Sequence, residues 1–222
     1  PSGTGGGALP GGVGWYRKTF TPTAADSDKK LYIDFDGAYM NATVYINGHE
    51  LGTRPYGYIS FSYDLTPYIE WGKPNVVAVR VDNAEQPNSR WYSGCGIYRH
   101  VWLRKLDPVH VAQWGTYVTT PHVTAQEATF SVQTNVENTT DEAQTITLQT
   151  SLIDADGRVV AVAEPASLTL DAHAITATTQ SLTLANPRLW SVDAPYLYRA
   201  CTELIAPDGR LLDTYTTTTG AR

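Results

Sequence analysis

Apolar and polar residues alternate with a period of two along much of this chain. The clearest runs place apolar side chains at Leu31, Ile33 and Phe35, at Val77, Val79 and Val81, and at Phe130, Val132 and Val136. Because successive side chains of a β-strand point to opposite faces, such runs predict strands with one buried face. No stretch has the longer period of an amphipathic helix. The sequence therefore predicts an all-β protein.

Turn-forming residues separate the alternating runs. Asn47-Gly48 is the sharpest hairpin signal, because both residue types accept the positive φ angles of a tight two-residue turn. Asp156-Gly157 and Pro207-Asp208-Gly209 mark two further turns. Short strands joined by turns are typical of β-sandwiches.

The 222 residues suit two domains of about 100 residues each, although one large β domain has the same length. A boundary is predicted within the basic, proline-bearing stretch from Lys105 to Val111, where the composition changes. Residues 1–108 are rich in aromatic residues and glycine and predict a jelly-roll β-sandwich. Residues 109–222 contain about seven short alternating runs and predict an immunoglobulin-like β-sandwich.

The charge of the chain restricts its partners. A net charge of -6 argues against nucleic acid and against an anionic membrane surface, since both require a clustered basic face. No apolar run approaches the length of a membrane span. A neutral partner fits this charge better.

Metal and cofactor chemistry has little support in the sequence. The two cysteines, Cys95 and Cys201, are interpreted as free thiols. Asp154-Ala155-Asp156-Gly157 lacks the later glutamate of a calcium loop and is interpreted as a hairpin turn, and the glycines from Gly3 to Gly7 follow no strand, which excludes a phosphate cradle. The histidines have no metal-ligand spacing and are His49, His100, His110, His122 and His173. We predict no metal site and no cofactor.

Three stretches carry a resemblance to a known family. They are INGHELG with RPYGYISFSYDLTPYI, NVVAVRVDN with SRWYSGCGIYRHVWL, and NPRLWSVDAPYLY. Together they resemble family 2 glycoside hydrolases. The first two are similar to the amino-terminal, galactose-binding-like jelly roll of that family, and the third to the end of its immunoglobulin-like second domain.

The resemblance implies a fragment of a retaining glycoside hydrolase, most of all a β-galactosidase. In that family both catalytic carboxylates belong to an α/β barrel that would follow Arg222, so no catalytic residue is expected here and the chain alone is expected to be inactive. Retaining hydrolysis needs two opposed carboxyl groups about 5–5.5 Å apart. The acids that lie close in sequence, Asp34 with Asp36 and Asp82 with Glu85, are interpreted as surface or turn residues.

The start of the chain departs from the family. The tryptophan-bearing opening strand and its Pro-His-Asp stretch are missing ahead of Pro1, so the jelly roll is expected to be incomplete. An edge left by a lost strand favours weak self-association.

A sugar-facing loop is predicted between Glu85 and Gly96. Arg90, Trp91 and Tyr92 combine flat aromatic rings with a planar donor group, which suits the C–H face and the hydroxyls of a pyranose. The glycines at 94 and 96 permit positive φ in a tight turn. The alternative is structural, with Trp91 closing the top of the jelly roll and Arg90 satisfying a buried acceptor.

Neighbouring residues extend this candidate site. In lactose-cleaving relatives an acidic residue binds galactose and sodium two places before the matching tryptophan, but Ser89 stands there, so the metal ligand is not carried over. Asn88 either replaces part of that hydrogen bonding or forms a turn. Arg54 and Tyr56 either line the same face or serve packing and surface ion pairs.

An aromatic group near the end of the chain is interpreted as structural. It consists of Trp190, Pro195, Tyr196 and Tyr198. Its place near the exit toward a barrel suggests a contact between domains.

Three functions compete. The first is an enzyme fragment that frames the active site for a β-galactoside, with the enzyme's own barrel as partner, a possible homo-oligomer, and β-glucuronides or β-mannosides as alternative substrates. The second is an independent carbohydrate-binding module with an immunoglobulin-like spacer. The third is an adhesion or scaffolding protein, which ranks last because the sequence offers one domain of each type rather than repeated sandwiches.

Overall fold

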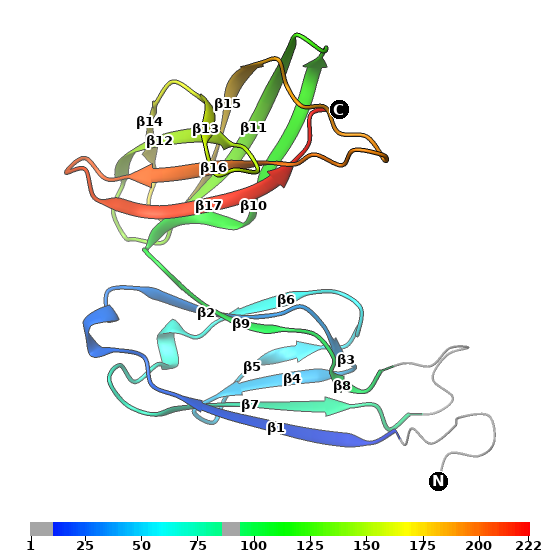
Figure 1. The fold of residues 1–222 in the computed structure, drawn as a ribbon. Helices are drawn as coiled ribbons and strands as arrows, with labels where there is room; N and C mark the ends of the chain where they lie inside the picture. The colour runs from blue at the N-terminus through cyan, green and yellow to red at the C-terminus, as the bar shows by residue number, and fades with distance from the viewer. Residues whose placement is uncertain (1–10, 86–93) are drawn as a thin grey trace. The chain divides into compact units, whose positions relative to one another are not determined.

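A computed structural model describes residues 11–85 and 94–222. These residues divide into two compact units, with the boundary between Lys105 and Leu106. Almost every ordered segment is a β-strand, which confirms the all-β prediction (Figure 1). The described helices are two short 3-10 turns, Ala24–Asp26 and Thr66–Tyr68, and none is long and apolar enough to cross a membrane.

The first unit contains two larger sheets and a small one. The four-stranded sheet has the order β1 (Val13–Phe20), β7 (Asn75–Asp82), β4 (Ala42–Ile46) and β5 (His49–Arg54). The three-stranded sheet has the order β6 (Phe61–Asp64), β2 (Lys30–Phe35) and β9 (Val101–Leu106). The small sheet pairs β3 (Ala38–Tyr39) with β8 (Gly96–Ile97).

The core of the first unit contains the alternating residues that the sequence predicted. Leu31, Ile33 and Phe35 are buried on β2, and Phe35 stacks on Phe61 with ring centroids 4.8 Å apart. The valines of β7 point into the same core, at Val77, Val79 and Val81. The predicted hairpin joins β4 to β5, with φ of 49° at Asn47 and 88° at Gly48. Burial of one face thus determines the register of these strands.

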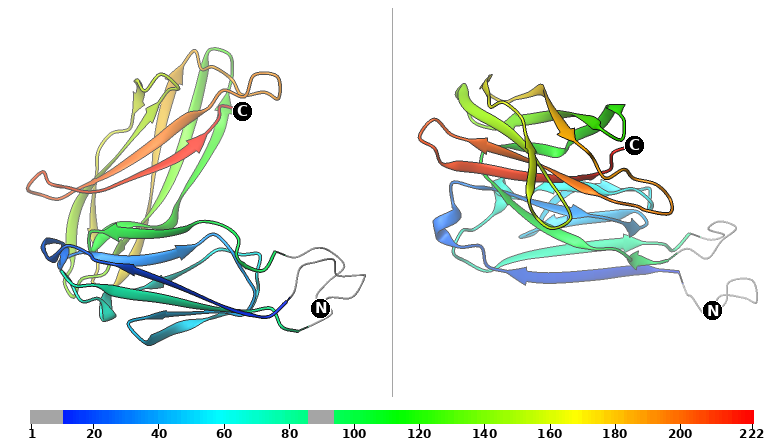
Figure 2. Two further views of the ribbon diagram at one scale, coloured as in Figure 1. Left: turned by 60° about the horizontal axis from the view of Figure 1, so that its bottom comes forward. Right: turned by 45° about the horizontal axis from the view of Figure 1, so that its top comes forward.

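Strands β1 and β9 lie at the ends of their sheets, and both views in Figure 2 show β1 as an edge strand beside β7. Tyr16 on β1 faces the core side, because it lies opposite the buried Val79. Val101 and Leu103 also take core-facing positions of β9, yet 41% and 49% of their surfaces are exposed. Such apolar edges favour pairing with another strand, and the expected self-association stays a prediction.

The second unit is a β-sandwich with eight strands from β10 to β17, where about seven were predicted from the sequence. One sheet has the order β10 (Val109–Val123), β11 (Glu127–Asn138) and β15 (Ala174–Ala185). The other has β13 (Val159–Val162), β12 (Gln144–Ile153), β16 (Tyr198–Ile205) and β17 (Leu211–Thr219), with β14 (Ala166–Leu170) also on β12. Phe130, Val132 and Val136 are buried between the sheets, as the alternation predicted.

The aromatic group near the end of the chain packs within the second unit. The Tyr198 side chain is buried, and burial raises the pKa of its hydroxyl. Its ring lies 5.0 Å from that of Tyr196, and the Arg188 guanidinium lies 4.0 Å from the Tyr196 centroid. Trp190 forms a β-bridge with Pro195. These contacts make the segment from Arg188 to Tyr198 a firmly held loop.

Candidate functional site

Most of the predicted sugar-facing residues cannot be located. Asn88, Ser89, Arg90, Trp91 and Tyr92 lie outside the described residues. Arg54 and Tyr56 lie within them. The candidate site is therefore built from the two sides of the loop's stem and from the side chains around them.

The stem of the loop is fixed by hydrogen bonds on both sides. The Asn83 side-chain amide donates to the Cys95 sulfur at 2.8 Å, which links the residue directly after β7 to the residue directly before β8. The Asp82 carboxylate accepts from the Ala84 N–H at 3.0 Å and from Arg80 at 2.7 Å. The Ala84 N–H and then the Arg80 guanidinium lower the pKa of the Asp82 carboxyl. The loop thus leaves the sheet from an anchored base.

Gly96 begins β8, directly after the loop. Its φ is +86°, as the glycine-flanked turn predicted, and a Cβ there would lie 1.9 Å from the Tyr16 hydroxyl oxygen. No other residue type fits both the dihedral and the space. Gly96 pairs with Tyr39, so the loop returns to the sheet beside β3.

Four tyrosines gather around β3 and form what we call the tyrosine cluster: Tyr39, Tyr56, Tyr58 and Tyr98. The ring of Tyr58 lies 5.1 Å from that of Tyr39 and 5.7 Å from that of Tyr56. The Tyr98 hydroxyl donates to the Gly57 carbonyl at 2.8 Å. A Cβ on Gly57 would lie 2.2 Å from the Tyr39 ring, so the glycine permits this close packing.

The tyrosine cluster combines exposed aromatic faces with hydroxyl groups. Tyr56 and Tyr58 expose 58% and 55% of their surfaces, whereas Tyr39 is buried beneath them. Ring faces with polar tips suit a pyranose, which has an apolar C–H face and hydroxyl groups around its edge. The sequence analysis singled out Tyr56 alone. The repeated tyrosines of the segment RPYGYIS were the signal that could have identified Tyr58.

Arg54 packs against aromatic rings at the end of β5. Its guanidinium lies 5.8 Å from the Phe61 ring centroid, and its Nε atom is buried without a hydrogen-bond partner among the described residues. Burial raises the pKa of the Tyr63 hydroxyl, and the Arg54 guanidinium acts against this rise. A role of Arg54 in binding sugar stays a prediction.

Asp34 on β2 and Asp36, directly after β2, are bound to separate partners. The Asp34 carboxylate is buried and accepts hydrogen bonds from two nitrogens of the Arg104 guanidinium. The same guanidinium lies 5.1 Å from the Tyr32 ring centroid. Asp36 accepts from the Trp102 indole at 3.1 Å and lies 3.6 Å from a His100 ring nitrogen. Both carboxylates therefore have structural hydrogen bonds. Among the described residues, no group of three His, Cys, Asp or Glu side chains is arranged to hold a metal ion.

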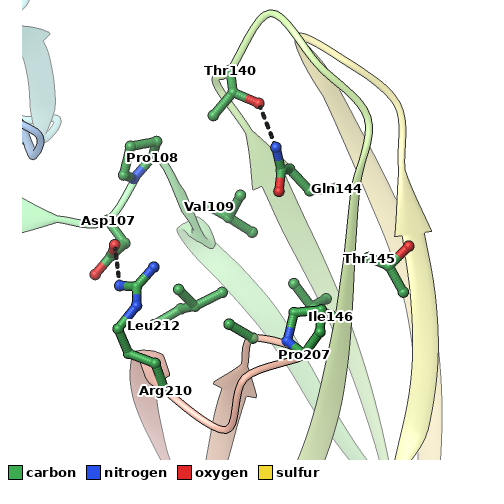
Figure 3. Close-up of a pocket in the computed structure, with 11 residues that line it drawn as sticks. Asp107, Pro108, Val109, Thr140, Gln144, Thr145, Ile146, Pro207, Arg210 and Leu212 are labelled. Atoms are coloured by element: carbon green, nitrogen blue, oxygen red, sulfur yellow. Dashed lines mark hydrogen bonds and ion pairs between the residues drawn. The ribbon is translucent and has the colours of Figure 1, made fainter.

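A separate pocket of about 150 Å³ lies in the second unit (Figure 3). Val109, Ile146 and Leu212 form an apolar part of its wall, and an ion pair of 3.1 Å between Asp107 and Arg210 forms part of its rim. None of the sugar-facing residues predicted from the sequence lines it.

Comparison with known proteins identifies two matching families. Residues 109–222 match the family described as "Glycosyl hydrolases family 2". Residues 13–121 match the family described as "Glycosyl hydrolase 2 galactose-binding domain-like". The two matches together extend from β1 to the end of the chain.

Curated relatives and solved structures agree with these matches. The chain is 57% identical to "Beta-galactosidase BoGH2A" of Bacteroides ovatus, over 100% of this chain and 26% of that protein. It is 40% identical to a "Putative beta-glucuronidase" of Formosa agariphila, over 99% of this chain and 20% of that protein. A crystal structure of a family 2 glycosyl hydrolase from Bacteroides cellulosilyticus has a TM-score of 0.91 and 40% identity, covering 96% of this chain and 29% of that one.

These relatives show both the family and the extent of the match. The chain spans about a quarter of the length of the curated relatives that it matches. One family profile alone covers more than half of it, from β10 to Arg222. The chain belongs to glycoside hydrolase family 2.

Proposed function

We propose that this chain is the amino-terminal region of a longer, retaining β-galactosidase, in which it frames the active site and does not itself break the glycosidic bond. The observation that carries the proposal is the 57% identity, over all 222 residues, to a relative named as a β-galactosidase. Since the match covers about a quarter of that relative, the catalytic groups are assigned to the remainder of the protein.

The geometry of the first unit supports a sugar-facing role. The loop that carries Arg90, Trp91 and Tyr92 is anchored through Asn83 and Cys95. It returns beside the tyrosine cluster, whose exposed rings offer stacking surfaces. We assign Arg90 the role of donor to sugar hydroxyls and the two aromatic residues the role of stacking platform. Asn88, Ser89 and Arg54 are assigned supporting hydrogen bonds around the same sugar.

The hydrogen-bond partners of two closely spaced acids, Asp34 and Asp36, support the assignment of hydrolysis to another part of the protein. A retaining mechanism needs one carboxyl group that donates a proton and one carboxylate that attacks the sugar, about 5–5.5 Å apart. Both oxygens of Asp34 accept hydrogen bonds from Arg104, and one oxygen of Asp36 accepts from Trp102, so these two acids act as hydrogen-bond acceptors within the first unit.

We assign the contact with a catalytic barrel to the firmly held loop of the second unit. Val192, near the tip of that loop, exposes 84% of its surface, and the nearby Leu189 and Leu197 are also exposed. Backbone hydrogen bonds fix the loop, with the Trp190 N–H donating to the Ala221 carbonyl at 2.9 Å. A rigid loop with apolar side chains loses little entropy when it docks.

A β-glucuronide is the second candidate substrate. Several relatives carry that name, including one 34% identical to this chain over 95% of its length. A glucuronide differs from a galactoside by the carboxylate at C6 and by the orientation of the C4 hydroxyl, and Arg90 or Arg54 offers the planar donor that a carboxylate prefers.

The proposal is tested on the longer protein that contains this chain. We expect it to hydrolyse a chromogenic β-galactoside faster than the matching β-glucuronide. We also expect Arg90→Ala to lower kcat/KM by about ten-fold or more without lowering the thermal unfolding temperature. Arg158→Ala is the matched control, since Arg158 is an exposed arginine in a hairpin of the second unit. Unchanged kinetics of Arg90→Ala would remove Arg90 from the site, and a preference for the glucuronide would select the second candidate.

A further inference from the structure

The four-stranded sheet of the first unit has an outer face that the proposed function does not use. On β7 the valines point into the core, so Ala78 and Arg80 point outward. The strand register places Trp15 on β1 and Thr43 on β4 on either side of Arg80. One residue pair further along the sheet, Arg17 and Tyr45 lie on either side of Ala78. We call these six residues the outer face: Trp15, Arg17, Thr43, Tyr45, Ala78 and Arg80.

An aromatic platform lies across this face. Trp15 exposes 61% of its surface, although it belongs to a regular strand. Its ring stacks toward that of Tyr45, with centroids 5.9 Å apart and planes inclined by 30°. The small side chain of Ala78 lies between the two strands and leaves room for the rings to approach each other. An exposed indole beside a second aromatic ring on one face of a sheet offers a surface on which a ring-shaped ligand can stack.

Polar groups surround the platform and leave it without a net charge. The Arg80 guanidinium is paired with Asp82 at 2.7 Å, and the Thr43 hydroxyl lies 2.8 Å from that of Thr53. Burial first, and then the neighbouring Glu50 carboxylate, raise the pKa of Tyr45. Arg17 adds a second guanidinium, so two cations face two carboxylates. Such a balance disfavours nucleic acid or an acidic peptide and suits an uncharged ligand with many hydroxyl groups.

We propose that the outer face binds a neutral oligosaccharide, with Trp15 and Tyr45 stacking on successive sugar rings while Arg17 and Arg80 hydrogen-bond the hydroxyls. The choice of a saccharide rests on the proposed function, because a glycoside hydrolase meets glycan chains. The outer face is separate from the tyrosine cluster, which is built from β3 and the loops around it rather than from the sheet. A second binding surface would hold a long substrate while one end enters the active site.

The test uses the 222-residue chain and soluble β-galactan oligosaccharides. We expect saturable, weak binding by titration calorimetry, accompanied by a change in tryptophan fluorescence. Trp15→Ala should weaken this binding by about ten-fold, since it removes one stacking surface. Trp102→Ala is the control, because Trp102 is a comparably exposed tryptophan on the other sheet. Arg17→Ala should weaken binding to a smaller extent.

Three results would overturn the inference. They are no saturable binding of the oligosaccharides, binding that Trp15→Ala leaves unchanged, and stronger binding of a charged oligogalacturonide of equal length. Trp15→Ala should leave the hydrolysis of a small chromogenic glycoside by the longer protein unchanged. If the unmodified longer protein did not hydrolyse the small glycoside, the proposed function would be contradicted. If the chain did not bind the oligosaccharides, only the outer-face inference would be contradicted.

Discussion

Replacing Arg104 by methionine is expected to lower the free energy of unfolding by about 3–5 kcal/mol, because it leaves a buried carboxylate without its partner. Asp34 exposes only 8% of its surface, and the Arg104 guanidinium supplies two of its hydrogen bonds. Urea unfolding followed by circular dichroism would measure the change. The double variant Asp34→Asn, Arg104→Met should recover much of the loss, because the uncompensated charge is removed with its partner.

The control for this experiment is an exposed ion pair. Arg158 lies 3.4 Å from Asp156, and both side chains are largely exposed. Arg158→Met should change the free energy of unfolding by less than about 0.5 kcal/mol. A loss of less than about 1 kcal/mol for Arg104→Met would show that water or another group compensates Asp34, contrary to our description of this pair.

The second large effect is expected in the core of the second unit. Phe130→Ala should lower the free energy of unfolding by about 3–5 kcal/mol, through lost apolar burial and the cavity left behind. The Phe130 ring is fully buried and meets Tyr198 edge-on with centroids 5.8 Å apart.

Guanidinium unfolding of Phe130→Ala would be compared with that of Tyr117→Ala. Tyr117 lies on the neighbouring strand β10 and exposes 67% of its surface, so its removal should have an effect below about 0.5 kcal/mol. Equal decreases in the free energy of unfolding for the two variants would mean that neighbouring side chains repack into the space left by Phe130. Phe130 would then not be a main source of stability for the sandwich.

The sequence predicted those strands that bury one face. On β2 and β7 the buried apolar residues recur at every second position, so the period of two was visible. The Asn47-Gly48 hairpin was visible because its residue types report the φ angles directly. The alternation did not predict strand β1, because most of its side chains are exposed on both faces and its apolar residues follow no simple alternation.

The candidate site was predictable only where its residues are adjacent in sequence. Arg90, Trp91 and Tyr92 are consecutive, so their combined chemistry could be read from the chain. The tyrosine cluster joins residues from three segments, and its formation depends on the space beside Gly57 and on the pairing of β3 with β8. Local patterns contain no information on such pairing. The packing of Arg54 on Phe61 depends on tertiary structure in the same way.

The acids show why the fold alone does not determine activity. Two carboxylates that are two positions apart resemble a catalytic pair in sequence, but Asp34 and Asp36 accept structural hydrogen bonds from Arg104 and from Trp102. Catalysis requires carboxyl groups that are free to exchange protons and to attack the sugar. We propose that the first unit presents stacking surfaces and donors to a saccharide, and that the opposed acids come from the remainder of the longer protein.

The most direct test of this account is an assay of the purified 222-residue chain with a chromogenic β-galactoside. We predict release of the chromophore at the rate seen in buffer alone. Hydrolysis that follows the chain through successive purification steps, and that scales with its concentration, would contradict the claim that these two units only frame the reaction.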